Sequence, residues 1–141
     1  MKPVTGPDLC HCLAARRLAR YASRLYDRHL SAVGLSISQF SLLALIEQTP
    51  GIGIGELTAE MVMERTTTVR ALRPLIDDGV VVAAREEGQK GHGYKLSPHG
   101  LALFQRAECC WKDAQAAYER HAGRSRAVAV RNEMLDLSGL R

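Results

Sequence analysis

The stretch MERTTTVRALRPLIDDGVV, residues 63–81, decides how the rest of the chain is interpreted. A helical step of roughly 100° per residue separates it into an apolar side and a side rich in threonine and arginine. The apolar side, which is expected to be core, carries Val69, Leu72, Leu75 and Ile76. The opposite side carries Thr66, Thr67, Arg70, Arg73 and Asp77. Gly79 is expected to end this helix before a valine-rich strand.

Arginine offers a planar fork of donors, and threonine offers a hydroxyl and a methyl group. These groups match guanine edges, thymine methyls and phosphates in a major groove of DNA. For an isolated helix, a solvated face is the simpler interpretation. The surroundings favour DNA, because a short helix precedes this one and two strands joined by a basic, glycine-rich turn follow it. That order is typical of a helix-turn-helix with a wing, on which Lys90, His92 and Lys95 would lie.

The remaining elements follow from local signals. The predicted fold is mainly α (α+β), in the order α-α-(β)-α-α-β-β-α-α. Ser38 is expected to cap the second helix, and Ser97 with Pro98 is expected to start the fifth. The expected helices cover residues 8–33, 38–49, a short piece within 52–62 after a short extended segment, 64–78, 98–121 and 126–137. The expected wing strands start at Val80 and Tyr94.

Composition bounds the function. The 141 residues carry a net charge of +4, with 46% hydrophobic and 24% charged residues, which suits one globular domain and permits a polyanionic partner. No apolar run approaches the roughly 20 residues of a membrane span, and the first residues do not resemble a signal peptide. We therefore expect a cytoplasmic protein. Aromatic residues make up only 5% and are not interleaved with basic ones, which disfavours a platform for single strands.

Three segments resemble the MarR family of winged helix-turn-helix transcription factors: LYDRHLSAVGLSISQFSLLALI (25–46), GELTAEMVMERTTTVRALRPLIDDGVV (55–81) and LSPHG (96–100). Recognition helices of that family commonly begin Asp-Arg-Thr-Thr, and here Glu64 to Thr67 reads Glu-Arg-Thr-Thr. The resemblance implies a single domain, 1–141, with a DNA-binding lobe at 36–100 and dimerisation helices at 7–34 and 101–138. It implies a homodimeric repressor on a pseudo-palindromic operator. The implied DNA-binding residues are Arg65, Thr66, Thr67, Arg70, Arg73, Lys90 and His92.

The wing departs from the family pattern. Relatives usually carry Asp-x-Arg at positions that here hold Gly88 and Lys90. A lysine is a point charge without the arginine fork. The wing is therefore expected to contact phosphates rather than to read bases.

Four cysteines are expected to be free thiols in a reducing compartment. Cys10, His11 and Cys12 invite a metal interpretation, but Cys10 and Cys12 would point about 200° apart on one helix. We therefore expect neither a metal site nor a cofactor. Cys109 and Cys110 are expected to pack, although either is also a candidate resolving thiol for Cys12.

The spacing of Cys12 and Tyr26 resembles that of the organic-hydroperoxide sensors of the same family, in which a tyrosine of the partner subunit hydrogen-bonds the reactive cysteine. The second tyrosine of those sensors aligns with Ile37. Two interpretations stay open: Cys12 is a redox sensor, or it is a core residue near Leu9 and Leu13. Tyr21 and Tyr26 are also expected to line an effector cavity between the dimerisation helices and the DNA-binding lobe, where relatives bind phenolic acids.

Two other classes of function compete. An enzyme is disfavoured because the sequence contains no phosphate loop, HExxH motif, nucleophile elbow or paired carboxylates. A winged-helix module that binds protein instead of specific DNA is the remaining alternative.

Overall fold

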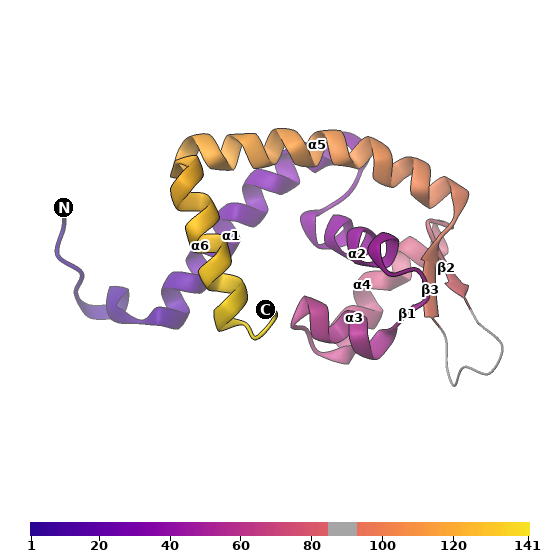
Figure 1. The fold of residues 1–141 in the computed structure, drawn as a ribbon, viewed down its shortest axis with the longest axis horizontal. Helices are drawn as coiled ribbons and strands as arrows, with labels where there is room; N and C mark the ends of the chain where they lie inside the picture. Colours follow the sequence, from indigo (N-terminus) through magenta and orange to yellow (C-terminus); the bar gives the residue numbers. More distant parts are fainter. Residues whose placement is uncertain (85–92) are drawn as a thin grey trace.

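The computed structural model describes residues 1–84 and 93–141. The expected order of helices and strands is confirmed, with two short 3-10 helices (η) added (Figure 1). The elements are η1 Gly6–Leu9, α1 His11–Leu30, η2 Ser31–Val33, α2 Ile37–Gln48, β1 Ile52–Gly53, α3 Ile54–Met61, α4 Arg65–Asp77, β2 Val81–Ala84, β3 Gly93–Leu96, α5 Pro98–Ala122 and α6 Arg124–Leu137.

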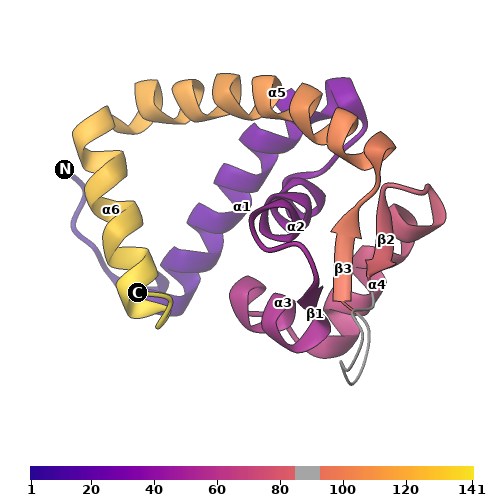
Figure 2. The same ribbon diagram turned by 45° about the vertical axis from the view of Figure 1, so that its right-hand side comes forward.

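The helices divide between two regions of the molecule. Helices α2, α3 and α4 gather with the strands into a lobe, while α6 lies away from it (Figure 2). Helix α1 contacts the lobe only through its C-terminal part, where Leu30 joins the core and Asp27 accepts from the Ile37 amide. Helix α5 runs from the lobe along α1 and reaches α6, so it connects both regions (Figure 1). Within the described residues no single helix could cross a membrane; only α1 with η2 and α2, a pair bent by 74°, passes a test of length and composition.

The strands form one small antiparallel sheet in the order β1-β3-β2. Val81 faces Leu96 and Ala84 faces Gly93 across the β2–β3 pair, while Ile52 of β1 faces Tyr94. The hairpin is the base of a wing. Lys90 and His92 lie outside the described residues.

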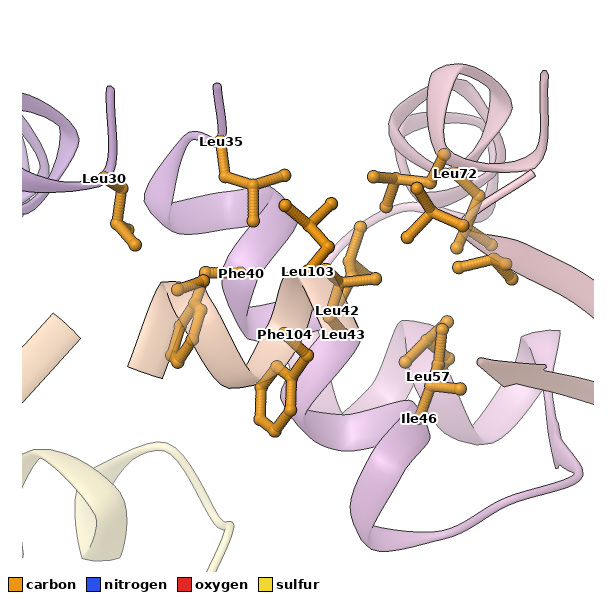
Figure 3. Packing of buried hydrophobic residues seen from close by; sticks show 14 of the residues in the cluster. Leu30, Leu35, Phe40, Leu42, Leu43, Ile46, Leu57, Leu72, Leu103 and Phe104 are labelled. Carbon is orange, nitrogen blue, oxygen red and sulfur yellow. The ribbon is translucent and has the colours of Figure 1, made fainter. Parts of the chain in front are cut away.

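The core joins the lobe to α5. Helix α2 contributes four buried side chains to it: Phe40, Leu42, Leu43 and Ile46 (Figure 3). The ring of Phe40 stacks on Phe104 and Trp111 of α5, at centroid distances of 5.4 and 6.1 Å. Phe104 is buried in the core and Trp111 packs partly buried against it. Each large side chain buried in this way contributes about 1.5–3 kcal/mol, so the first half of α5 is held firmly to the lobe.

The starts of α1 and α2 differ from the sequence-based expectation, and α6 starts at Arg124 rather than at residue 126. Ser36, not Ser38, caps α2: its hydroxyl accepts from the Gln39 amide at 3.1 Å, and the Gln39 side chain accepts from the Ser36 amide at 3.0 Å. The first helix does not run from Asp8. It is interrupted at Cys10, whose extended backbone (φ −78°, ψ 113°) makes it the N-cap of α1, with its sulfur accepting from Leu13 N at 3.4 Å.

The motif LSPHG forms the joint between the wing and α5. Ser97 caps α5 as expected: its hydroxyl accepts from the Gly100 amide at 2.9 Å and donates to the Gly79 carbonyl. The Ser97 amide donates to the Val80 carbonyl at 3.0 Å. Gly100 lies against that same carbonyl, where a Cβ atom would come within 2.0 Å of the oxygen. The end of α4, the start of β2 and the start of α5 are thus bonded into one unit.

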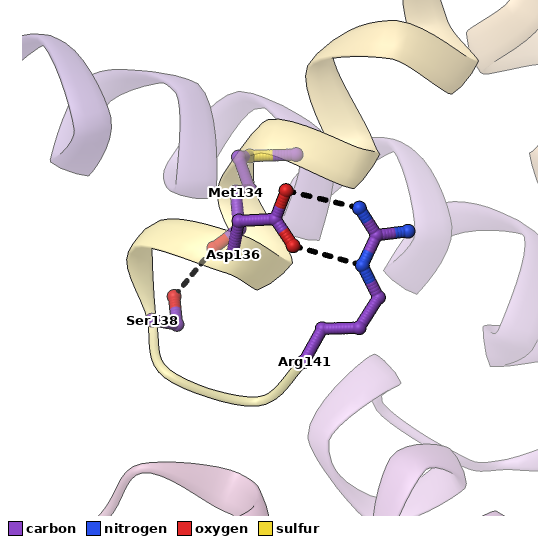
Figure 4. Close-up of polar contacts among 4 residues, drawn as sticks. All are labelled: Met134, Asp136, Ser138 and Arg141. Carbon is purple, nitrogen blue, oxygen red and sulfur yellow. Dashed lines mark hydrogen bonds and ion pairs between the residues drawn. The ribbon is translucent and has the colours of Figure 1, made fainter.

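The C-terminal end folds back on α6. Arg141 forms a two-pronged ion pair with Asp136, at 2.8 and 3.0 Å, and the Ser138 hydroxyl donates to the Met134 carbonyl (Figure 4). Because the ion pair is half exposed, it adds little stability.

Candidate DNA-binding face and effector pocket

A tight turn between α3 and α4 sets the direction of α4. Val62 between α3 and α4 has a left-handed backbone (φ 52°, ψ 46°), which is unusual for a β-branched residue. The Val62 and Met63 amides donate to the Ala59 and Thr58 carbonyls at 3.1 Å each. The turn therefore closes α3 with backbone bonds and lets α4 start at Arg65.

The buried side of α4 is narrower than the helical wheel predicts. Leu72 and Leu75 are buried as expected, but Val69 and Ile76 are 40% and 42% exposed, so their assignment to the core was wrong. Thr68 is buried in their place, and its hydroxyl donates to the Glu64 carbonyl at 3.2 Å. The physical reason is that the contact stripe is centred on Leu72 and Leu75, which leaves Val69 and Ile76 at its margin.

The opposite side of α4 presents all the predicted residues of that helix. Five side chains are exposed: Arg65, Thr66, Thr67, Arg70 and Arg73. All but Thr67 line an open hollow along the helix, together with Val69 and Pro74. Within the described part of the chain none of these arginines forms an ion pair. This face therefore offers exposed guanidinium groups that suit a polyanion.

A second site lies among α1, α5 and α6. It is an apolar pocket of about 260 Å³. Its lining residues are Ala15, Leu18, Ala19, Ala22, Tyr26, Gln115, Tyr118, Glu119, Ala127, Val128, Arg131 and Met134. No residue of the lobe lines it, so this pocket does not lie between the dimerisation helices and the lobe, where an effector cavity was expected. Tyr21 does not line it either, because its ring packs against His121 at 4.9 Å.

Tyr26 is the predicted effector residue that does lie in this pocket. Its hydroxyl donates to the side-chain oxygen of Gln115, a residue 89 positions away that no local pattern singles out. Burial, with Tyr118 and Glu119 nearby, raises the pKa of the Tyr26 phenol. The phenol is therefore a neutral hydrogen-bond donor at neutral pH, and the Gln115 side-chain oxygen accepts its hydrogen bond.

Cys12 lies exposed on the first turn of α1. The interpretation that it packs with Leu9 and Leu13 in a core does not hold within one chain, because Leu9 is 65% exposed. Cys109 is exposed as well and Cys110 is half-buried, so the expected packing role does not hold for Cys109. Among the described residues no three His, Cys, Asp or Glu side chains converge.

Comparisons with known proteins match this geometry. The MarR family model matches residues 35–86. The M. tuberculosis transcriptional regulator MosR is 32% identical over 92% of this chain and 93% of its own, with a TM-score of 0.79, and its complex with DNA gives 0.80. A comparison with curated sequences gave no match.

Two further solved structures share the fold at lower identity. The repressor CouR bound to a 23-mer DNA duplex is 20% identical over 97% of this chain and 99% of its own, with a TM-score of 0.83. The oxidised form of E. coli MarR is 17% identical over 91% and 93%, with a TM-score of 0.74. The identity with MosR over nearly the full length of both chains, together with the family match across α2 to β2, shows that this chain belongs to the MarR family of winged helix transcriptional regulators.

Proposed function

We propose that this protein is a homodimeric repressor that binds a pseudo-palindromic operator through α4. The observation that carries the proposal is the exposed Thr/Arg face of α4, whose guanidinium groups have no ion-pair partner in the described part of the chain. The complex of MosR with DNA supports it, as the relative shares 32% of its sequence. Arg70 and Arg73 are proposed to contact base edges, and Arg65, Thr66 and Thr67 bases or phosphates. Lys90 and His92 on the wing are proposed to contact the backbone.

The proposed dimer would bury an apolar surface that one chain leaves exposed. Leu9 near the N-terminus is 65% exposed, and Met134 and Leu137 of α6 are 43% and 85% exposed. Exposed apolar side chains on η1 and α6 support association through the two ends of the chain. Two recognition helices would then enter successive major grooves about 34 Å apart.

The test is operator binding by Arg70→Ala at fixed salt. If Arg70 contacts a base with two hydrogen bonds, its loss costs about 1–3 kcal/mol and relaxes selectivity at one position. Arg106→Ala, at an exposed arginine of α5, is the control and should bind normally. Duplex binding without sequence preference or salt dependence would instead favour a protein-interaction module.

Release from DNA is proposed to follow oxidation of Cys12 or binding of a small aromatic ligand. The exposure of Cys12 supports the first route, because an oxidant reaches it directly. For Tyr26 of a second copy to stabilise the Cys12 thiolate, its hydroxyl must first leave Gln115. Peroxide titration of the operator complex tests this route: Cys12→Ser should remove the response, and Cys109→Ser, at another exposed cysteine, should keep it. A response that survives in Cys12→Ser would end the redox proposal.

The pocket beside Tyr26 supports the second route. It combines apolar walls with phenol groups and Arg131, which suits an aromatic body carrying a negative charge. CouR, 21% identical, has been solved with p-coumaroyl-CoA. A ligand among α1, α5 and α6 would lie within the proposed dimer surface and act only through its different affinity for the two packings. Titration with p-coumarate should release DNA from the wild type and act weakly on Arg131→Ala.

A further inference from the structure

Val69 stands out on the exposed face of α4. It is 40% exposed and lines the same hollow as three arginines, with Arg65 one turn before it and Arg73 one turn after it. Ile76 is similarly exposed, at 42%, but does not line the hollow. A β-branched apolar side chain is therefore held at the centre of a face that is otherwise built to donate hydrogen bonds.

The chemistry of Val69 limits what it can recognise. Its side chain contains only carbon and hydrogen, so it forms no hydrogen bond with a phosphate or with the edge of guanine, adenine or cytosine. The major-groove edge of a base pair has one apolar group, the C5-methyl of thymine. We infer that Val69 reads a thymine methyl, so that thymine is specified at one position in each operator half-site. This inference rests on the proposed entry of α4 into the major groove.

The helix also sets where this thymine lies. One turn of helix advances about 5.4 Å, and one base step advances about 3.4 Å along a strand. Because Arg65 and Arg73 lie one turn to either side of Val69, the thymine should fall one or two steps from base pairs that face those arginines. Thr66 contributes the other methyl group in the hollow and is the competing reader of the same thymine.

The experiment removes the methyl group from the DNA rather than from the protein. A preferred duplex is first selected from a random library with the wild-type protein. Each thymine is then replaced by deoxyuridine, symmetrically in both half-sites, and the dissociation constant is measured by fluorescence anisotropy at one salt concentration. Burial of one methyl group is expected to contribute about fourfold in affinity per half-site, or about 16-fold for both. One symmetric position should show this loss.

Three variants assign the lost methyl contact. Val69→Ala should bind the duplex with thymine at that position and the duplex with deoxyuridine there with equal affinity. Thr66→Ser and Ile76→Ala should keep the wild-type difference in affinity between the two duplexes. A flat deoxyuridine profile in the wild type would overturn the inference while leaving operator binding intact. A difference that disappears in Thr66→Ser but persists in Val69→Ala would also overturn it, in favour of Thr66. Failure to select any duplex would instead remove the proposed function, and the inference with it.

Discussion

Replacement of Gly100 is expected to destabilise the fold, because the structure leaves no space for a side chain at this position. It is the third residue of α5 and is fully packed against the Val80 carbonyl. An alanine Cβ at this position would lie 2.0 Å from the Val80 oxygen and 2.9 Å from its carbon. An ordinary C···O contact is about 3.3–3.6 Å, so the two backbones would have to separate by more than 1 Å.

The magnitude follows from two opposing effects. Alanine is favoured over glycine within a helix by about 1 kcal/mol. Overpacking typically costs about 1–3 kcal/mol and occasionally more. The atom in the way is the backbone carbonyl of Val80, which accepts a hydrogen bond from the Ser97 amide and directly precedes β2. It therefore cannot rotate aside as a side chain would. With overpacking at the upper end of that range, about 3 kcal/mol, and a gain of about 1 kcal/mol from the better helix former, we expect Gly100→Ala to lower the free energy of unfolding by about 2 kcal/mol.

Urea unfolding followed by circular dichroism, at one protein concentration, measures this change. With a urea dependence of about 2 kcal/mol per molar, the midpoint should fall by about 1 M. The matched control is Gly55→Ala in α3, where a Cβ would meet nothing within 4 Å. That variant should be stabilised by about 0.5–1 kcal/mol. If Gly100→Ala were as stable as Gly55→Ala, the close approach of α5 to Val80 would be refuted.

Three further predictions concern the turn between α3 and α4, the start of α2, and α6. Val62→Gly should raise the thermal midpoint, because the left-handed backbone costs a β-branched residue about 1–2 kcal/mol; an unchanged or lower midpoint would contradict this. Asp27→Ala should lower the free energy of unfolding by about 1 kcal/mol, since its carboxylate accepts from Ile37 N at 2.7 Å at the start of α2. In urea titrations Asp27→Asn should retain most of that stability. Deleting residues 124–141 should give monomers or aggregates by light scattering and abolish operator binding; a stable, active truncated protein would refute the role of α6.

Local signals account for the elements that were predicted correctly. Gly34 ends the first helical segment with a left-handed backbone (φ 73°), and Ser97 with Pro98 starts α5. Such positions need particular backbone angles or caps, and few residue types supply them. The start of α2 is also predictable from the sequence, because Ser36 and Gln39 have the S-x-x-Q spacing of a capping box. The interruption at Cys10 is not predictable in this way, since it depends on the 3-10 turn that precedes it.

The buried stripe of α4 depends on tertiary packing. A helical wheel orders the side chains around the axis, but the elements on which the helix lies decide how wide the buried arc is. Helix α4 contacts α2, α3 and β2, and that surface takes up Thr68, Leu72 and Leu75 and stops short of Val69. Thr68 is buried without penalty because its hydroxyl finds a carbonyl one turn earlier. The same rotation that buries a threonine turns a valine toward the candidate DNA face.

The two proposed routes of release meet at Tyr26. The spacing of Cys12 and Tyr26 is visible in the sequence, but the acceptor of the phenol is decided by the packing of α1 on α5, which brings Gln115 to it. Cys12 and Tyr26 both lie on α1, 14 positions apart, or about 21 Å along a helix, so Cys12 would reach Tyr26 only across two copies. A ligand in the pocket would meet the same hydroxyl. Since one hydroxyl has a single proton to donate, Gln115, a bound ligand and a Cys12 thiolate compete for it. In the proposed mechanism, oxidation of Cys12 and ligand binding would therefore both work through the hydrogen bond of Tyr26 to Gln115.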